Sequence, residues 1–205
     1  MGLYSTQVLP RLINVACGMK DTRPVRERAC TGLRGRVVEI GFGSGHNIPF
    51  YGPTVDSVSA VEPADVAWNL ARKQLADSPV RIERAGLDGQ RLTFDDASFD
   101  SALSTFTLCT IPDVAAALLE IRRVLRPGGT VHFAEHGLAP DEGVRRWQRR
   151  LEPTEKVVFG GCHLTRDIPH LLIDAGFEIK ELDQFYQPAT PKPMGAFSVG
   201  YAVIP

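Results

Sequence analysis

From Arg36 onward, short apolar runs alternate with segments of helical periodicity, and this alternation is the feature that most constrains the fold. The runs that predict strands are 37–40, 55–61, 79–83, 99–106 and 130–135. The segments that predict helices are 64–76 and 112–125. Strands that alternate with helices at these spacings form parallel sheets, because each crossover needs a dozen or more residues. The pattern therefore predicts an α/β chain with a doubly wound, mostly parallel sheet.

The alternation stops after Gly176. Two further apolar runs, 177–185 and 197–204, are separated by a Pro-rich loop that has no room for a crossover helix. We expect these two strands to pair antiparallel as a hairpin at the edge of the sheet. A length of 205 residues suits one such domain with a sizeable core, and two full domains would be cramped.

The N-terminal segment has a different character. Apolar residues recur at helical spacing over 3–19 and predict an amphipathic helix; they are Val8, Leu9, Leu12, Ile13 and Ala16. Two interpretations of this helix stay open, since it can either pack onto the domain or form a lid over a ligand site. We divide the chain into an N-terminal helical lid or cap, residues 1–35, and a ligand-binding domain, residues 36–205.

Composition excludes several classes of protein. A net charge of -1 and a pI near 6.5 provide no broad basic field, which disfavours a nucleic-acid partner. The chain has no run of about 18 apolar residues and no signal-peptide pattern, so we expect no stable membrane insertion. Its four scattered cysteines form no CxxC pair, which argues against a metal site and a disulfide framework. We therefore expect a cytoplasmic protein.

The first predicted strand ends in a loop with glycine at every second position, Gly41, Gly43 and Gly45. Glycines here let the backbone turn tightly and approach a ligand closely. An acidic residue, Glu62, ends the next strand, where its carboxylate can accept both ribose hydroxyls of an adenosine. The loop and Glu62 together indicate a cofactor that contains adenosine.

Two details separate the candidate cofactors. The glycine spacing differs from the G-x-G-x-x-G pattern of dinucleotide sites, and an acidic residue, Glu39, stands at the end of the first strand. A negative charge beside the loop would repel a pyrophosphate, whereas it can organise the loop and attract an ammonium group through water. The ligand that these residues favour is zwitterionic and has no phosphate.

Four blocks in this order resemble the class I S-adenosylmethionine-dependent methyltransferases: 38–45, 61–63, 92–100 and 120–129. The resemblance implies a Rossmann-like seven-stranded methyltransferase fold with a C-terminal antiparallel hairpin, and S-adenosyl-L-methionine as the cofactor. It implies that the glycines hold the methionine end and Glu62 the ribose. The full set of expected cofactor-binding residues is Glu39, Gly41, Gly43, Gly45, Glu62, Pro63, Gly86, Leu87, Asp88, Ser104 and Thr105.

A narrower likeness is carried by 4–11, 42–49, 133–137 and 161–167. These segments look like the branch that contains the vertebrate alkyl-thiol methyltransferases and bacterial relatives. This likeness favours transfer of a methyl group to a small, fairly apolar acceptor at S or O. We expect Tyr4, His163 and Arg166 to bind that small-molecule acceptor.

Methyl transfer from a sulfonium is an in-line displacement, so the protein mainly aligns donor and acceptor. Residues beyond the carboxyl ends of the fourth and fifth strands should lie beside the cofactor. His136 is the first candidate base, because imidazole titrates near neutral pH, and Glu135 could orient it or bind substrate. For both residues a hydrogen bond that ties down a loop is the alternative. Cys162 is not expected to act as a catalytic nucleophile, since the reaction needs no covalent intermediate.

Several other segments have an ordinary structural interpretation. Thr165 predicts a helix N-cap, and the cationic run 145–150 predicts a solvated helix face. The sequence 104–107 after the fourth strand lacks the N/D-P-P-Y motif of methyltransferases that act on nucleic-acid bases. This absence disfavours methylation of DNA or RNA bases.

Two other functions stay open. The block 92–100 also resembles quinone-biosynthesis methyltransferases, which would place C- or O-methylation on a quinone-like or lipid precursor. The second alternative is a cofactor-binding protein without transferase activity that acts through partners, since an intact loop permits binding without proving turnover.

Overall fold

A seven-stranded sheet forms the centre of the computed structural model, which describes residues 4–188 and 190–205. Its strand order is β3-β2-β1-β4-β5-β7-β6. The strands are β1 (Gly35–Ile40), β2 (Val55–Val61), β3 (Arg81–Gly86), β4 (Phe99–Thr105), β5 (Leu125–His136), β6 (Glu178–Tyr186) and β7 (Ala196–Val203). Strand β7 pairs antiparallel with β5 and β6, whereas the pairs from β3 to β5 are parallel. The predicted fold class is confirmed, including the terminal hairpin.

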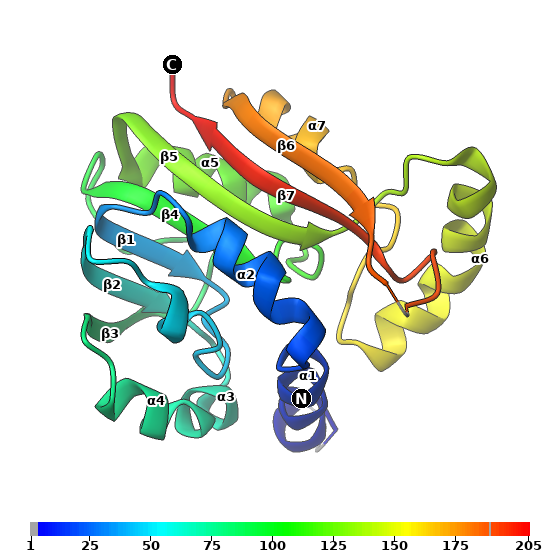
Figure 1. Ribbon diagram of the computed structural model, residues 1–205, viewed down its shortest axis with the longest axis horizontal. Helices are drawn as coiled ribbons and strands as arrows, with labels where there is room; N and C mark the ends of the chain where they lie inside the picture. The colour runs from blue at the N-terminus through cyan, green and yellow to red at the C-terminus, as the bar shows by residue number, and fades with distance from the viewer. Residues whose placement is uncertain (1–3, 189) are drawn as a thin grey trace.

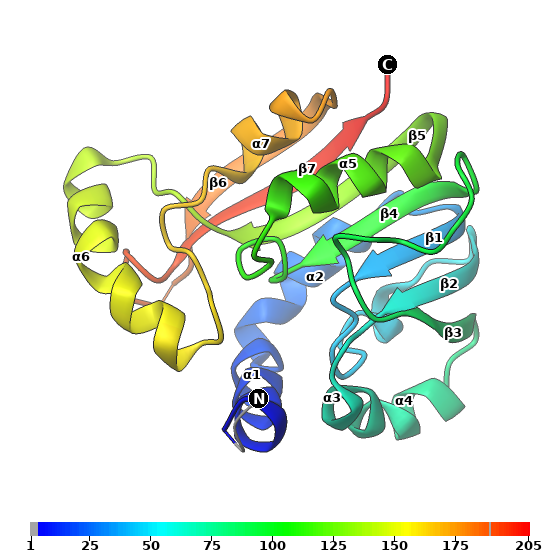
Figure 2. The same cartoon turned by 180° about the vertical axis from the view of Figure 1, so that it is seen from behind.

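Helices cover both faces of this sheet (Figures 1 and 2). The α-helices are α1 (Leu9–Cys17), α2 (Arg23–Cys30), α3 (Asp65–Leu70), α4 (Arg72–Ala76), α5 (Val114–Val124), α6 (Glu142–Val158) and α7 (Ile168–Asp174), of which α1 and α6 lie beyond the ends of the strands. Helix α2 lies on the face seen in Figure 1, and α5 and α7 lie on the face seen in Figure 2. The segment predicted as one helix, 64–76, is divided at Ala71 into α3 and α4.

Successive side chains of the central strands point to opposite faces of the sheet, and a hydrophobic core lies on each face. Val37 and Val38 of β1 are neighbours with no exposed surface, and they belong to different clusters. Val37 packs in the cluster that contains Ala29 of α2, and Val38 packs in the cluster that contains Leu118 of α5. Because both faces are buried, a shift of one residue in strand register would exchange the two cores, so the register is strongly specified.

The start of β5 departs from the prediction. The predicted strand begins at Thr130, but β5 already pairs with β4 at Leu125, opposite Phe99. The register then jumps to Ser101 opposite Thr130, so the residues between them bulge out of the ladder. Gly128 lies in this bulge with φ +74°, a conformation that glycine adopts at little cost.

The prediction that Thr165 caps a helix is wrong by two residues. The N-cap of α7 is Asp167, whose Oδ1 accepts a hydrogen bond from the His170 N–H at 3.3 Å. Thr165 instead donates its N–H and its hydroxyl to the carboxylate of Glu152, on α6. Thr165 therefore ties the start of the α7 segment to α6.

Residues 4–35 have two structural roles. Helix α2 packs on β4, β5 and β7, whereas α1 contacts α3 at the other side of the glycine loop. The π-helical turn Tyr4–Val8 leads into α1. In the part of the chain that the structure describes, no helix combines the length and apolar character needed to cross a bilayer.

Candidate functional site

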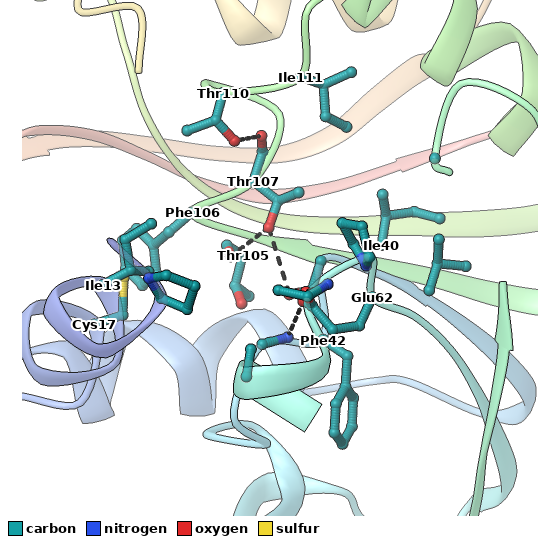
Figure 3. Close-up of a pocket in the computed structure, with 18 of the residues that line it drawn as sticks. Ile13, Cys17, Ile40, Phe42, Glu62, Thr105, Phe106, Thr107, Thr110 and Ile111 are labelled. Carbon is teal, nitrogen blue, oxygen red and sulfur yellow. Dashed lines mark hydrogen bonds between the residues drawn. The ribbon is translucent and has the colours of Figure 1, made fainter. Parts of the chain in front are cut away.

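A cavity of about 560 Å³ lies at the carboxyl ends of β1, β2 and β4. The loops that follow these strands form its floor and sides, and α1 covers it from the opposite side. In Figure 3, Ile13 and Cys17 of α1 lie on one side of the cavity and Glu62 lies on the other. The volume is in the range that holds a drug-sized ligand.

The glycine loop is as tight as its sequence predicts. Gly41 has φ +73°, and a Cβ at this position would lie 2.0 Å from the Thr107 Oγ1. Gly45 has φ +79°, and its Cβ would lie 2.8 Å from the Ile48 side chain. A side chain at either position would force the loop away from its neighbours, so the shape of the loop depends on these glycines.

Glu62, at the end of β2, holds the glycine loop. Its Oε2 accepts a hydrogen bond from the Gly43 N–H at 2.8 Å, and its Oε1 accepts one from the Ala64 N–H at 2.7 Å. Burial raises the pKa of Glu62, and these two backbone bonds oppose that rise. Each carboxylate oxygen still has a lone pair for a further donor. The side chain can therefore accept the two hydroxyls of a ribose.

Glu39 lies behind the loop and not on the cavity wall. It is fully buried and accepts hydrogen bonds from the Asn47 amide at 2.7 Å and from the Tyr51 hydroxyl. Burial raises the pKa of Glu39 to about 7, although both hydrogen bonds act in the opposite direction. The Asn47 amide also donates to the Thr105 Oγ1 at 2.9 Å, so Glu39 is linked to the cavity through a chain of polar groups.

Arg26 is a buried cation on the cavity wall, and the sequence interpretation missed it. Its Nη1 donates to Asn47 Oδ1 at 2.9 Å and to Thr105 Oγ1 at 2.8 Å, and its guanidinium lies 4.7 Å from the centre of the Phe106 ring. Its Nε has no hydrogen-bond partner among the described residues. A buried N–H without an acceptor costs about 1–3 kcal/mol, so a ligand carboxylate at this place would be stabilised.

Phe106, the residue after β4, also lines the cavity and has an unusual backbone. Its φ is +54°, which is rare for a bulky side chain and occurs most often at functional sites. The Phe106 N–H donates to the Ala134 carbonyl at 2.9 Å, and the ring packs edge-on against Phe197. These contacts hold the ring over the cavity.

The structure brings most of the expected cofactor-binding residues together. The cavity wall includes Gly41, Gly43, Glu62, Pro63, Leu87, Asp88 and Thr105. Four others lie outside the wall: Glu39, Gly45, Gly86 and Ser104. Polar wall residues that the sequence interpretation did not select are Asn14, Arg26, Ser44, His46, Gln90, Thr107 and Thr110.

The candidate base His136 and its neighbour Glu135 do not line the cavity. Glu135 is fully buried and accepts hydrogen bonds from the Ser104 hydroxyl at 2.7 Å and the Thr107 N–H at 3.0 Å. It holds the loop after β4, the alternative that the sequence left open. His136 is buried, with its Nδ1 3.4 Å from the Cys162 Sγ.

The three residues expected to bind the acceptor also lie off the cavity wall. The Tyr4 hydroxyl donates to the Val158 carbonyl at 2.7 Å, which joins the N-terminal turn to the end of α6. Arg166 donates to the carbonyls of Leu108 and Ile111, so it braces the loop after β4. His163 lies 3.5 Å from the Glu152 carboxylate. Their positions give them supporting contacts around the cavity.

Comparison with known proteins places this arrangement in a family. Residues 38–133 match the family model of a methyltransferase domain. The chain belongs to the class I S-adenosylmethionine-dependent methyltransferases, and it is therefore an enzyme that uses S-adenosyl-L-methionine. No group of three or more His, Cys, Asp or Glu side chains within residues 4–188 and 190–205 could hold a metal ion.

The chain is also similar to individual methyltransferases over most of its length. The chain is 33% identical over 184 residues to the thiol S-methyltransferase TMT1B of Homo sapiens, covering 86% of this chain and 74% of the relative. It is 31% identical over 151 residues to a phosphatidylethanolamine N-methyltransferase of Cereibacter sphaeroides, covering 72% of each. A solved structure from Thermotoga maritima, described as a possible histamine N-methyltransferase, shares the fold with a TM-score of 0.68 and 24% identity. That match covers 96% of this chain and 98% of the other.

The wall residues fit the family's cofactor. Glu62 would accept the ribose hydroxyls, the glycine loop allows close approach, and the unpartnered Nε of Arg26 fits the methionine carboxylate. Leu87 and Asp88, after β3, would lie beside the adenine. When bound, the cofactor supplies a methyl group on a positively charged sulfur that needs no further activation.

Proposed function

We propose that this enzyme methylates the sulfur of a small, largely apolar thiol. The observation that supports this most is the make-up of the cavity beneath α1. Apolar side chains from α1 and from the loop after β4 line part of this wall beside its polar groups, and the acids and the imidazole of the wall are already hydrogen-bonded; these apolar residues are Leu9, Pro10, Ile13, Phe106 and Ile111. Such a pocket accepts an apolar molecule and provides no unengaged base.

The hydrogen bonds of the ionisable wall residues support this reasoning. Glu62 is bonded to two backbone N–H groups, and the Asp88 Oδ1 accepts from the Gln90 N–H at 2.9 Å. The His46 Nε2 lies 3.1 Å from the Asn14 carbonyl, and burial lowers the pKa of His46. An alcohol acceptor benefits from a general base, whereas thiols are far more acidic than alcohols; a cysteine thiol, with a pKa of about 8.5, already forms a few per cent of thiolate near neutral pH. The cation of Arg26 favours a nearby thiolate.

The chain's own residues then act by binding and alignment. The glycine loop and Glu62 fix the methyl donor, while Ile13 and Phe106 exclude water from the acceptor. A thiolate held in an apolar pocket loses the hydration that masks its charge, and alignment lowers the barrier further. The name of the human relative, a thiol S-methyltransferase, supports the same acceptor class. A cytoplasmic location stays a prediction.

The test is a turnover assay with matched acceptors. The purified chain is mixed with S-adenosyl-L-methionine and with pairs that differ only in the acceptor atom, such as an alkanethiol and its alcohol, or a thiophenol and its phenol. We expect S-adenosylhomocysteine to form with the thiols, and its rate to rise with pH through the pKa of the thiol. Turnover on phenols or quinols but not on thiols would overturn the proposal in favour of a quinone-like acceptor.

A pair of variants tests the position of the acceptor. Ile13→Ala removes apolar surface from the cavity wall, and a loss of about 1–2 kcal/mol corresponds to a rise in KM of roughly 5- to 30-fold for an alkanethiol. Leu12→Ala is the matched control, because Leu12 is an exposed residue of the same helix. Equal KM values for the two variants would show that the acceptor does not lie beneath α1.

A further inference from the structure

Outside the cavity, two thiols and an imidazole meet where the segment 160–163 lies against the loop after β4. The His163 N–H donates to the Cys109 carbonyl at 2.9 Å and joins the two segments. Cys162 directly precedes His163, so this bond brings the two buried cysteines together, and their thiols are near enough to shift each other's ionisation. The His136 Nδ1 lies 3.4 Å from the Cys162 Sγ. Neither cysteine lines the cavity, and methyl transfer requires neither.

The two thiols differ in ionisation. The hydrogen bond from Cys109, together with the contact to His136, lowers the pKa of Cys162 to about 5, although burial opposes this shift. The same contact and burial raise the pKa of Cys109. Two more charged groups act on Cys162, since His163 favours its thiolate and Arg166 lies close enough to interact with it. Glu155 of α6 also interacts with Cys162, and burial together with the negative charge of the Cys162 thiolate raises the pKa of Glu155. The two shifts have opposite directions, so ionisation is favoured at Cys162 over Cys109.

We propose that Cys162 and Cys109 form an oxidisable pair that reacts with hydroperoxides and closes to a disulfide. The contact between the two thiols and the imidazole beside Cys162 carry this inference, which does not depend on the identity of the methyl acceptor. A low-pKa cysteine beside a second thiol is the arrangement that peroxide-sensitive sites use.

The reaction has two steps. The Cys162 thiolate attacks one oxygen of the hydroperoxide, so an S–O bond forms, the O–O bond breaks, and the other oxygen leaves as alcohol or water after taking a proton. The Cys109 sulfur then attacks the Cys162 sulfenic acid, so the S–S bond forms, the S–O bond breaks, and water leaves with the Cys109 proton. Each disulfide consumes one hydroperoxide, and the two sulfurs together lose two electrons.

A disulfide here would connect parts of the cavity wall. Cys109 belongs to the loop that carries Phe106, Thr107 and Thr110 into the cavity. On the other side, Gly160 packs against Leu9 of α1, since a Cβ at Gly160 would lie 2.6 Å from the Leu9 side chain. Oxidation would therefore couple the loop after β4 to the segment beneath α1, and we expect it to change the affinity for S-adenosylhomocysteine.

Peptide mapping tests the pair directly, because trypsin separates all four cysteines: 12–20 contains Cys17, 29–34 contains Cys30, 92–122 contains Cys109 and 157–166 contains Cys162. The reduced full-length protein is treated with one to five equivalents of hydrogen peroxide, blocked with iodoacetamide and digested without reductant. We expect a 92–122/157–166 linked peptide, lighter by two hydrogens than its two parts, before Cys30 is modified. Cys30 is the internal control, since it is equally buried and burial raises the pKa of Cys30.

Variants give the proposal a second readout. In Cys109→Ser the sulfenic acid has no partner, so dimedone should label Cys162, whereas Cys30→Ser should form the disulfide as the wild type does. His136→Gln should slow the labelling of Cys162 at least several-fold. Circular dichroism checks each fold, and the linked peptide of the wild type decides the case if a variant does not fold. Oxidation of Cys17 or Cys30 ahead of Cys162, or no linked peptide at five equivalents, would overturn the proposal.

Discussion

Replacing Glu62 by Gln is the sharpest test of the cofactor site. The carboxylate accepts hydrogen bonds from the Gly43 and Ala64 N–H groups, at 2.8 and 2.7 Å, and both of its oxygens are acceptors. A Gln side chain has one oxygen and one NH₂ group, so one of the two N–H groups would face another donor. The substitution would also replace a charged acceptor for the ribose by a neutral one.

The magnitude follows from these bonds. A hydrogen bond to a charged group contributes about 1.5–3 kcal/mol, and every 1.4 kcal/mol is a factor of about ten in affinity. Loss of one such bond predicts a rise of roughly 10- to 100-fold in the Kd for S-adenosylhomocysteine, measured by titration calorimetry. Glu83→Gln is the control, because its partner Arg81 is exposed and such pairs contribute little. If Glu62→Gln binds as tightly as the wild type while remaining folded, Glu62 does not hold the cofactor.

Three further predictions concern the surroundings of this site. Arg26→Lys keeps the charge but loses the forked donors to Asn47 and Thr105. The Kd for S-adenosylhomocysteine, measured by calorimetry, should therefore rise about 10-fold. Arg23→Lys, also on α2, is the control and should leave this Kd unchanged. Gly41→Ala should lower the free energy of unfolding by at least about 1–2 kcal/mol in urea titrations, whereas Gly143→Ala, which meets no neighbour, should not. The pKa of Glu39 is raised to about 7, so its contribution to stability is fully present below pH 4.5 and is lost as pH rises through 7. The wild type should therefore lose about 3 kcal/mol relative to Glu39→Gln between pH 4.5 and pH 8 in urea titrations; parallel curves would refute this assignment.

The sequence was sufficient for the sheet and for the floor of the cavity. Both depend on local signals, namely the period of the apolar residues and the glycines that follow the first strand. The hairpin followed from loop length, because the residues between the last two strands leave no room for a crossover. Glu62 could be located because parallel strands bring their carboxyl ends to one edge of the sheet.

The position of α1 over the cavity and the burial of the Arg26 cation depend on contacts between residues that are far apart in the sequence. Arg26 meets Thr105, 79 positions further along the chain, and it lies in the N-terminal segment that the sequence marks off only as a lid or cap. A local signal existed, since Arg26 lies on the same face of α2 as Ala29 and Cys30, all of them buried. A charged residue on the buried face of a helix indicates a paired or ligand-binding group.

The position of Glu135 and His136 outside the cavity wall has a simple structural cause. Both residues stand at the carboxyl end of β5, where the rule for open α/β sheets expects the ligand. However, the loop after β4 folds back across this end, and the Glu135 carboxylate holds the loop there by accepting a hydrogen bond from the Thr107 N–H. The cavity is therefore displaced toward β1 and β2. Because neither the candidate base His136 nor Glu135 lines the cavity, removal of the proton would be left to the acceptor itself, and this favours an atom as acidic as a thiol sulfur.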